Sequence, residues 1–239
     1  MAQEKRVALV TGGAVRVGRA IVEKLAAEGF AVAFTYRSSE AEATKLATQI
    51  DGHAIRADLV DPDIASKQVH ASFLTFANRL DLLVNNASVY RPARLRDTDM
   101  ALMRETAAVN VQAPLLLCQK FESLLRQSRG HVVNMCDLLG EKPWPEYLIY
   151  CASKAALANL TTGLARELAP EVTVNGIAPG VVQWPDGYPL ADREKYLKRV
   201  PLARPGTPED VAKLVHFLAT EGSYITGQII RLDGGRSIT

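Results

Sequence analysis

The stretch Thr11–Gly18, with the sequence T-G-G-A-V-R-V-G, joins an apolar run to a helical pattern and decides the fold. The run at residues 7–11 predicts a buried strand, and the helical pattern extends from Gly18 to about Glu28. Glycines in such a turn let the backbone approach a pyrophosphate, which then lies at the positive N-terminus of the helix. A turn without a ligand rarely needs three glycines. The stretch therefore predicts a nucleotide site, in which Arg16 replaces the middle glycine of the usual motif and can pair with phosphates.

Apolar runs and helical patterns alternate along the rest of the chain. The further strands are expected at residues 31–36, 53–57, 82–84, 131–136, 172–177 and 228–232. The further helices are expected at residues 39–50, from 61, at 98–127, 147–168 and 207–219, with an irregular stretch before the last. Because the strands are apolar throughout, both faces of the sheet must be covered, which is typical of a parallel sheet between two helix layers.

The predicted fold class is therefore α/β: a single Rossmann-like doubly wound parallel seven-stranded sheet with helices on both faces. No linker or repeat interrupts residues 1–239, so we expect one domain, with a cofactor half at about 1–135 and a catalytic and substrate half at about 136–239. In such a sheet the ligand lies at the carboxyl ends of the strands.

Composition excludes several classes of protein. Lys plus Arg number 28 against 26 Asp plus Glu, a net charge of +2 without a basic block, so we expect no nucleic-acid partner. No apolar run approaches the roughly 20 residues that cross a bilayer, and the first nine residues do not resemble a secretory signal, so we expect a cytoplasmic protein without membrane contact. The four histidines are scattered, and the three cysteines lack C-x-x-C spacing, so we expect no metal and no disulfide.

The end of the second strand predicts which nicotinamide cofactor is bound. An NAD-binding protein would place Asp or Glu there for the ribose hydroxyls, whereas this chain has Tyr36, Arg37, Ser38 and Ser39. A guanidinium with neighbouring hydroxyls suits a 2′-phosphate, which favours NADPH. The alternative is that Arg37 is a solvated surface residue.

Tyr150 and Lys154 are four residues apart, on one face of a predicted helix. An ammonium group beside a phenol favours the phenolate and is expected to lower a pKa that is ordinarily about 10. Such a tyrosine can donate a proton to a carbonyl or imine. Taken alone, this spacing is common and usually structural.

In this order with the glycine turn, the chain resembles the short-chain dehydrogenase/reductase family over nearly its full length. The matching residues are Thr11–Gly18, Asp58, Leu59, Asn85, Asn86, Ala87, Asn110, Tyr150, Lys154, Asn175, Pro179 and Gly180. The resemblance implies that Asp58 contacts adenine, Asn86 a ribose and Lys154 the nicotinamide ribose, that Asn110 supports proton relay to Tyr150, and that the protein is a homotetramer. The cofactor residues implied in full are Gly12, Arg16, Val17, Gly18, Tyr36, Arg37, Ser38, Asp58, Leu59, Asn86, Ala87, Ser88, Tyr150, Lys154, Pro179, Gly180 and Val182.

Two departures from the family pattern are similar to its pteridine reductase branch. Asp137 stands where the family usually has a serine, and Arg16 stands at a glycine position. A pterin carries N–H and amino donors that a carboxylate can accept. The resemblance implies a pterin or folate substrate, reduced with NADPH while Tyr150, Asp137 and Lys154 supply the proton. The substrate residues implied are Arg16, Ser88, Tyr90, Asp137, Tyr150 and Trp184, of which Tyr90 replaces a phenylalanine and Trp184 a threonine of the family.

Three alternatives remain open. The first is an NADPH-dependent ketoreductase of 3-oxoacyl or sugar type, although the carboxylate of Asp137 would repel a developing oxyanion. The second is a catalytically silent NADP(H)-binding regulator, because this fold also hosts proteins without turnover. The third is a reductase whose substrate is a synthetic or xenobiotic heterocycle.

Overall fold

The computed structural model describes residues 5–184 and 187–239. The expectation about a secretory signal depends partly on residues 1–4, which lie outside the described residues. Strands β1 (Val7–Val10), β2 (Ala31–Tyr36), β3 (His53–Arg56), β4 (Leu82–Asn85), β5 (His131–Met135), β6 (Thr173–Pro179) and β7 (Ile229–Leu232) form one sheet. Its order is β3-β2-β1-β4-β5-β6-β7, and all neighbouring strands are parallel. This confirms the predicted fold class.

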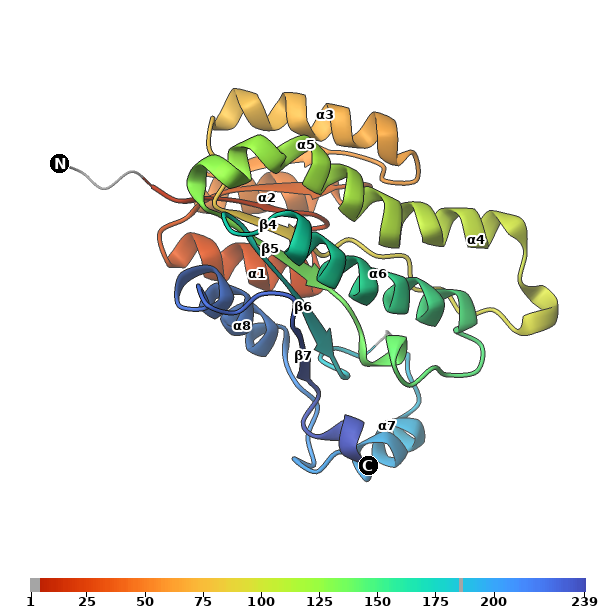
Figure 1. Ribbon diagram of the computed structural model, residues 1–239. Coiled ribbons are helices and arrows are strands. Elements are labelled where there is room, and N and C mark those ends of the chain that lie inside the picture. The colour runs from red at the N-terminus through yellow and green to blue at the C-terminus, as the bar shows by residue number, and fades with distance from the viewer. Residues whose placement is uncertain (1–4, 185–186) are drawn as a thin grey trace.

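Helices cover both faces of the sheet (Figure 1). On one face, α1 (Arg16–Ala27), α2 (Glu40–Ile50) and α8 (Pro208–Thr220) share a core that includes Val22, Leu46 and Val215. On the other face, α3 (Pro62–Phe76), α5 (Ala113–Ser128) and α6 (Leu148–Glu167) share a core that includes Phe73 and Phe121. The sheet is apolar on both faces because each face is buried under a helix layer.

The helix expected at residues 98–127 is helical from Met100 to Ser128, but its middle is not α-helical. The structure has α4 (Met100–Ala107), a π-helical turn (Ala108–Gln112) and then α5. Pro114 lies in the first turn of α5, and proline has no amide hydrogen for a bond to the carbonyl one turn earlier. The π-helical turn directly before α5 contains Asn110, one of the predicted site residues.

A second difference lies in the stretch expected to be irregular. It contains the helix α7 (Leu190–Leu197), which lies near the chain's C-terminal end in Figure 1. Of its eight residues four are charged and one is a tyrosine, and none is fully buried. The amphipathic pattern that predicts a helix is therefore weak here.

The order of the strands positions the functional site. From β1 the chain proceeds to β2 and β3 on one side, and then returns to β4 on the other side of β1. Two connections leave the sheet in opposite directions at this point, which opens a crevice beyond the carboxyl ends of β1 and β4. In the described part of the chain, no helix is both long and apolar enough to span a bilayer.

Candidate active site

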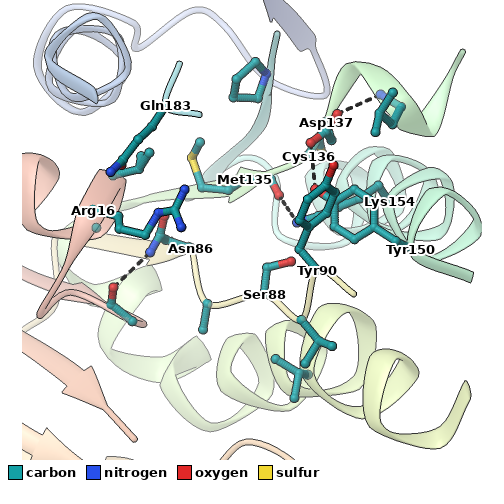
Figure 2. A pocket seen from close by; sticks show the side chains of 18 of the residues that line it. Arg16, Asn86, Ser88, Tyr90, Met135, Cys136, Asp137, Tyr150, Lys154 and Gln183 are labelled. Carbon is teal, nitrogen blue, oxygen red and sulfur yellow. Dashed lines mark hydrogen bonds between the residues drawn. The ribbon is translucent and has the colours of Figure 1, made fainter. Parts of the chain in front are cut away.

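A cavity of about 800 Å³ lies at the carboxyl ends of the strands and is lined by side chains from both halves of the chain. It brings together the predicted residues Gly12, Arg16, Val17, Gly18, Tyr36, Arg37, Asp58, Leu59, Asn86, Ala87, Ser88, Tyr90, Asp137, Tyr150, Lys154, Pro179, Gly180 and Val182. Three predicted residues are not among its lining: Ser38, Asn110 and Trp184. Figure 2 shows Arg16, Asn86 and Gln183 on one side and Asp137, Tyr150 and Lys154 on the other.

The glycine turn after β1 is packed against the end of β4. The Thr11 hydroxyl accepts hydrogen bonds of 2.9 Å from the amides of Asn86 and Ala87. The Asn86 side chain donates in return to the Thr11 carbonyl, at 2.9 Å. A Cβ on Gly18 would lie only 2.1 Å from the Gly12 carbonyl oxygen, so the close approach of turn and helix requires glycine there. The result is a bare backbone surface at the start of α1, suited to a pyrophosphate.

Arg16 has a backbone conformation that glycine adopts more readily than other residues. Its φ is +55°, in the left-handed region that non-glycine residues seldom occupy. The side chain is exposed and lines the cavity, and its guanidinium points into the space between the two sides in Figure 2. Strained backbone of this kind clusters at functional sites, which is consistent with a role for Arg16 in binding a ligand.

Arg37 lies at the cavity rim beside an acidic residue that sequence reasoning missed. Its Nη1 atom is 3.9 Å from Glu105 Oε1, while Arg91 Nη2 is 2.7 Å from Glu105 Oε2. All three line the cavity. Both arginine side chains are more than half exposed, so these ion pairs are screened by water and leave the guanidinium groups available. No motif indicates Glu105 or Arg91, because α4 and the loop before it meet Arg37 only in the folded chain.

The most direct contact in the site joins Tyr150 to Asp137. The Tyr150 hydroxyl donates to Asp137 Oδ2 at 2.6 Å, and Asp137 Oδ1 accepts a hydrogen bond of 2.8 Å from the Leu139 amide. Lys154 Nζ donates to the Met135 carbonyl at 2.7 Å and lies 5.6 Å from the centre of the Tyr150 ring. The start of α6 and the end of β5 therefore position the three side chains together.

The expected lowering of the Tyr150 pKa by Lys154 is wrong for this structure. Burial raises the pKa of Tyr150 well above its usual value, and the Asp137 carboxylate raises it further. Burial also raises the pKa of Asp137 and lowers that of Lys154. The partner of the phenol is thus a carboxylate rather than an ammonium, and Tyr150 keeps its proton at neutral pH.

Asn110 does not line the cavity, but it is hydrogen-bonded to Val89, which does. Its side-chain amide donates to Ser153 Oγ at 2.9 Å and to the Val89 carbonyl at 3.1 Å, and its carbonyl oxygen accepts from the Val89 amide at 2.8 Å. Ser153 in turn donates to the Tyr150 carbonyl at 2.7 Å. Asn110 therefore ties the loop after β4 to α6, and its part in proton relay stays a prediction.

Aromatic side chains pack around Tyr90 and Tyr196, which line the cavity. Tyr90 stacks on Tyr147 with ring centres 4.6 Å apart and meets the Tyr150 ring edge-on at 4.7 Å. Trp184 stacks on Tyr188 at 5.1 Å and packs edge-on against Tyr196 at 5.5 Å. Tyr196 lines the cavity and Trp184 packs behind it, so substrate contact by Trp184 stays a prediction.

Sequence reasoning did not name several further residues that line the cavity. They are Val15 within the glycine turn, and Thr35, Ala57, Val89, Val109, Met135, Cys136, Leu138, Leu139, Lys142, Gln183 and Arg236 outside it, besides Arg91 and Glu105. Over residues 5–184 and 187–239, no group of three His, Cys, Asp or Glu side chains could hold a metal ion.

The fold and the site define a class of proteins that bind a dinucleotide at the carboxyl edge of a doubly wound sheet. A family model described as enoyl-(acyl carrier protein) reductase matches residues 13–237. A 3-oxoacyl-[acyl-carrier-protein] reductase of Aquifex aeolicus is 34% identical, with 96% of each chain covered. Pteridine reductase 1 of Leishmania tarentolae is also 34% identical, with 98% of this chain and 96% of the relative covered.

Two solved structures are similar to this chain over nearly its full length. A short-chain dehydrogenase/reductase from Serratia marcescens has a TM-score of 0.90 and 32% identity, covering 97% of this chain and 98% of that one. A blue fluorescent protein from a metagenomic library, solved in complex with NADPH, also has a TM-score of 0.90 and 32% identity, covering 97% of each chain. The chain belongs to the short-chain dehydrogenase/reductase family. Within that family it is an NAD(P)-dependent oxidoreductase.

Proposed function

We propose that this protein is an NADPH-dependent reductase of pterin rings, converting a dihydropterin to a tetrahydropterin, with dihydrofolate as a further candidate substrate. The observation that carries the proposal is the 2.6 Å hydrogen bond from Tyr150 to Asp137. A carboxylate beside the proton donor suits a substrate rich in N–H and amino groups, because it can accept hydrogen bonds from them. The similarity to a pteridine reductase supports the same substrate class.

The cavity fits a dinucleotide. The bare turn at Gly12 and Gly18 would hold the pyrophosphate together with Arg16, and Arg37 would face a 2′-phosphate. By family resemblance, Asp58 would contact the adenine, and Asn86 and Lys154 the two riboses. When bound, NADPH supplies a hydride. The NADPH in the similar blue fluorescent protein and the absence of an acid among residues 36–39 support NADPH over NADH.

The residues of the chain supply the proton and hold the substrate. A C=N bond of the dihydropterin gains hydride at carbon and a proton at nitrogen, and Tyr150 gives that proton from its hydroxyl. Burial and the neighbouring carboxylate hold the pKa of Tyr150 high, so the hydroxyl is fully protonated before the reaction. Loss of the proton leaves a phenolate, which the ammonium group of Lys154, 5.6 Å from the ring centre, stabilises until solvent restores the proton. Asp137 orients the hydroxyl and accepts a donor of the ring.

Reduction of a 3-oxoacyl thioester is the second candidate function. It is favoured by the 34% identity to the Aquifex aeolicus reductase over 96% of both chains. Against it stands Asp137, because an ionised carboxylate 2.6 Å from the phenolic oxygen has no proton to donate to the carbonyl oxygen of a thioester.

We also propose that the chain acts as one domain, in a cytoplasmic homotetramer. The pairing of β5 with β6 supports one domain, because it joins the cofactor half to the catalytic half through a continuous sheet. The resemblance to the family supports the tetramer.

Oxidation of NADPH by the purified protein tests the proposed function. The panel is dihydrobiopterin, dihydromonapterin, dihydrofolate and an acetoacetyl thioester. Turnover of a pterin with no reaction of the thioester supports the proposal. Turnover of the thioester alone establishes the ketoreductase. If NADPH binds but is oxidised with none of the four compounds, both candidate functions are contradicted.

A further inference from the structure

Glu105 brings a carboxylate to the end of the cavity where the local sequence has none. Residues 36–39 contain no acid, and that absence favours NADPH over NADH. In the folded chain, however, Glu105 of α4 lines the cavity beside Arg37 and Arg91. We propose that Glu105 is a specificity-determining residue, which weakens the preference of this site for NADPH over NADH.

The residues around Arg37 form the part of the cavity that suits the adenosine ribose of a dinucleotide. In a doubly wound sheet the pyrophosphate lies at the turn after the first strand, and residues after the next strand face the 2′ position of the ribose. Tyr36 ends β2, Arg37 follows it, and both line the cavity. A 2′-phosphate bound here would therefore meet Arg37 and, next to it, Glu105.

The packing of α4 holds Glu105 at this place. Asp99 caps the helix by accepting a hydrogen bond of 2.8 Å from the Leu102 amide, and both Leu102 and Thr106 are buried. The Glu105 side chain is only 23% exposed, and its Oε2 atom lies 2.7 Å from Arg91 Nη2. The carboxylate is thus a built part of the cavity rim and not a side chain that extends freely into solvent.

The two arginines are paired with Glu105 to different degrees. Arg91 Nη2 is in direct contact at 2.7 Å, whereas Arg37 Nη1 is 3.9 Å from Glu105 Oε1 and belongs to a side chain that is 58% exposed. Arg37 is therefore held loosely and can turn toward a phosphate, while Arg91 stays with the carboxylate. The contact with Arg91 offsets part of the negative charge of Glu105, and the rest acts on whatever Arg37 binds.

A 2′-phosphate bound by Arg37 would be repelled by Glu105. A phosphate oxygen that is hydrogen-bonded to Arg37 Nη1 lies within about 7 Å of Glu105 Oε1, because the guanidinium nitrogen is itself 3.9 Å from that atom. This distance is shorter than the Debye length of about 8 Å at physiological salt, so the repulsion is only partly screened. NADH has a neutral hydroxyl at the same place, which can donate to a carboxylate. Glu105 therefore acts against NADPH alone.

This inference rests on the NADPH part of the proposed function and is independent of the substrate, since it is tested by binding without turnover. The Kd values of NADPH and NADH are measured by fluorescence titration for the wild type and for Glu105→Gln. Glu105→Gln should bind NADPH at least about 3-fold more tightly at about 0.15 M salt, and about 10-fold more tightly at about 0.01 M salt. The affinity for NADH should not rise.

Two further measurements separate charge from structure. The fragments 2′,5′-ADP and AMP carry the adenosine end without the nicotinamide, so only 2′,5′-ADP should bind Glu105→Gln more tightly than the wild type. Glu105→Asp keeps the charge and should gain less NADPH affinity than Glu105→Gln. A gain that is the same at low and high salt, or the same for both fragments, would overturn the inference, because a charge effect is screened and needs the 2′-phosphate.

Glu122→Gln is the matched control. Glu122 also pairs with an arginine, at 2.9 Å to Arg126, but it lies on α5 outside the cavity lining, so this variant should bind both cofactors as the wild type does. Melting temperatures report whether each variant is folded, and Arg37→Ala is the reference for contact with the 2′-phosphate. If Arg37→Ala loses NADPH affinity and Glu105→Gln gains none, the role of Glu105 is refuted and the NADPH proposal stands. If neither variant changes the ratio of the two Kd values, the NADPH proposal is refuted together with this inference.

Discussion

The Tyr150 hydroxyl donates a hydrogen bond of 2.6 Å to Asp137 Oδ2, so the proposed proton donor of this site is held by a carboxylate. The same carboxylate accepts the Leu139 amide through its other oxygen. One side chain thus shapes the backbone after β5 and determines the electrostatic surroundings of the phenol.

Replacing Asp137 with serine should abolish pterin reduction and spare cofactor binding. The serine hydroxyl can contact the phenol but does not offer the paired acceptors that a pterin needs. Positioned acid–base groups typically contribute about 10²–10⁴-fold, so kcat/KM should fall by at least about 10². NADPH affinity, measured by fluorescence titration, should change less than about threefold, because the carboxylate lies on the catalytic side of the cavity. Unchanged turnover of dihydropterin would remove Asp137 from the mechanism.

Replacing Asp137 with asparagine should stabilise the fold at neutral pH and not in acid. Burial raises the pKa of Asp137, so ionisation costs more in the folded chain than in the unfolded one. Below the unfolded-state pKa of about 3.9 both states are protonated and there is no penalty. As pH rises from there toward the folded-state pKa, the penalty grows in the wild type only, and it is complete above that pKa. Melting temperatures should therefore diverge toward about pH 8 and converge near about pH 3. A gain that is the same at both ends would mean that charge is not its cause.

Replacing Arg16 with glycine should raise the stability of the fold and weaken NADPH binding. Glycine adopts a φ of +55° without strain, so the free energy of unfolding should rise by about 0.5–1 kcal/mol. The lost guanidinium should weaken NADPH binding about 10-fold. Arg19→Gly, inside α1, is the control and should destabilise by about 1 kcal/mol. Tighter NADPH binding by Arg16→Gly would contradict the phosphate role.

Replacing Arg37 with alanine should change the choice of cofactor. A guanidinium that contacts a 2′-phosphate contributes a charged hydrogen bond, so the Kd of NADPH should rise about 10- to 100-fold and that of NADH should stay the same. The exposed Arg56, at the end of β3, provides the matched control and should have no effect when changed to alanine. An equal loss for both cofactors would show that Arg37 acts through the fold.

Replacing Gly18 with alanine should distort the glycine turn and weaken cofactor binding. The new Cβ would lie 2.1 Å from the Gly12 carbonyl oxygen and 2.7 Å from Asn86 Nδ2, so the turn must shift. Overpacking of this kind costs about 1–3 kcal/mol, and cofactor binding should fall with it. Gly163 lies in α6, where an added Cβ would meet nothing within 4 Å, so Gly163→Ala should raise stability by about 0.5–1 kcal/mol. Calorimetric melting with and without NADPH separates the two effects.

The alternation of apolar runs and helical patterns was enough to predict the sheet, because each strand of a parallel sheet is apolar on its own. The π-helical turn before Pro114 was not predicted, since the hydrophobic pattern continues across it and the missing amide hydrogen of the proline is only a weak local signal. The sequence did not predict helix α7, because hydrophobic periodicity is the signal for a helix and this helix, which buries no residue fully, has no apolar stripe.

In the site, motifs predicted the residues that lie near one another in sequence or that the family pattern names. Electrostatic effects could not be predicted in the same way. The spacing of Tyr150 and Lys154 indicates that they are neighbours. The direction of the shift in the Tyr150 pKa, however, is determined by burial and by Asp137. Lys142 and Arg236 are 94 positions apart and meet only because the turn after β5 and the end of the chain are folded together.

The left-handed backbone at Arg16 has a consequence for how such proteins are found. A motif search that demands glycine at this position would pass over the chain, although its backbone follows the course that glycine normally permits. The nucleotide turn of this chain is thus marked by the torsion angle at residue 16 rather than by the residue type there. Surveys of genomes for nucleotide-dependent reductases would gain members by allowing arginine at this position, and those members would form a group with a positive charge built into the turn.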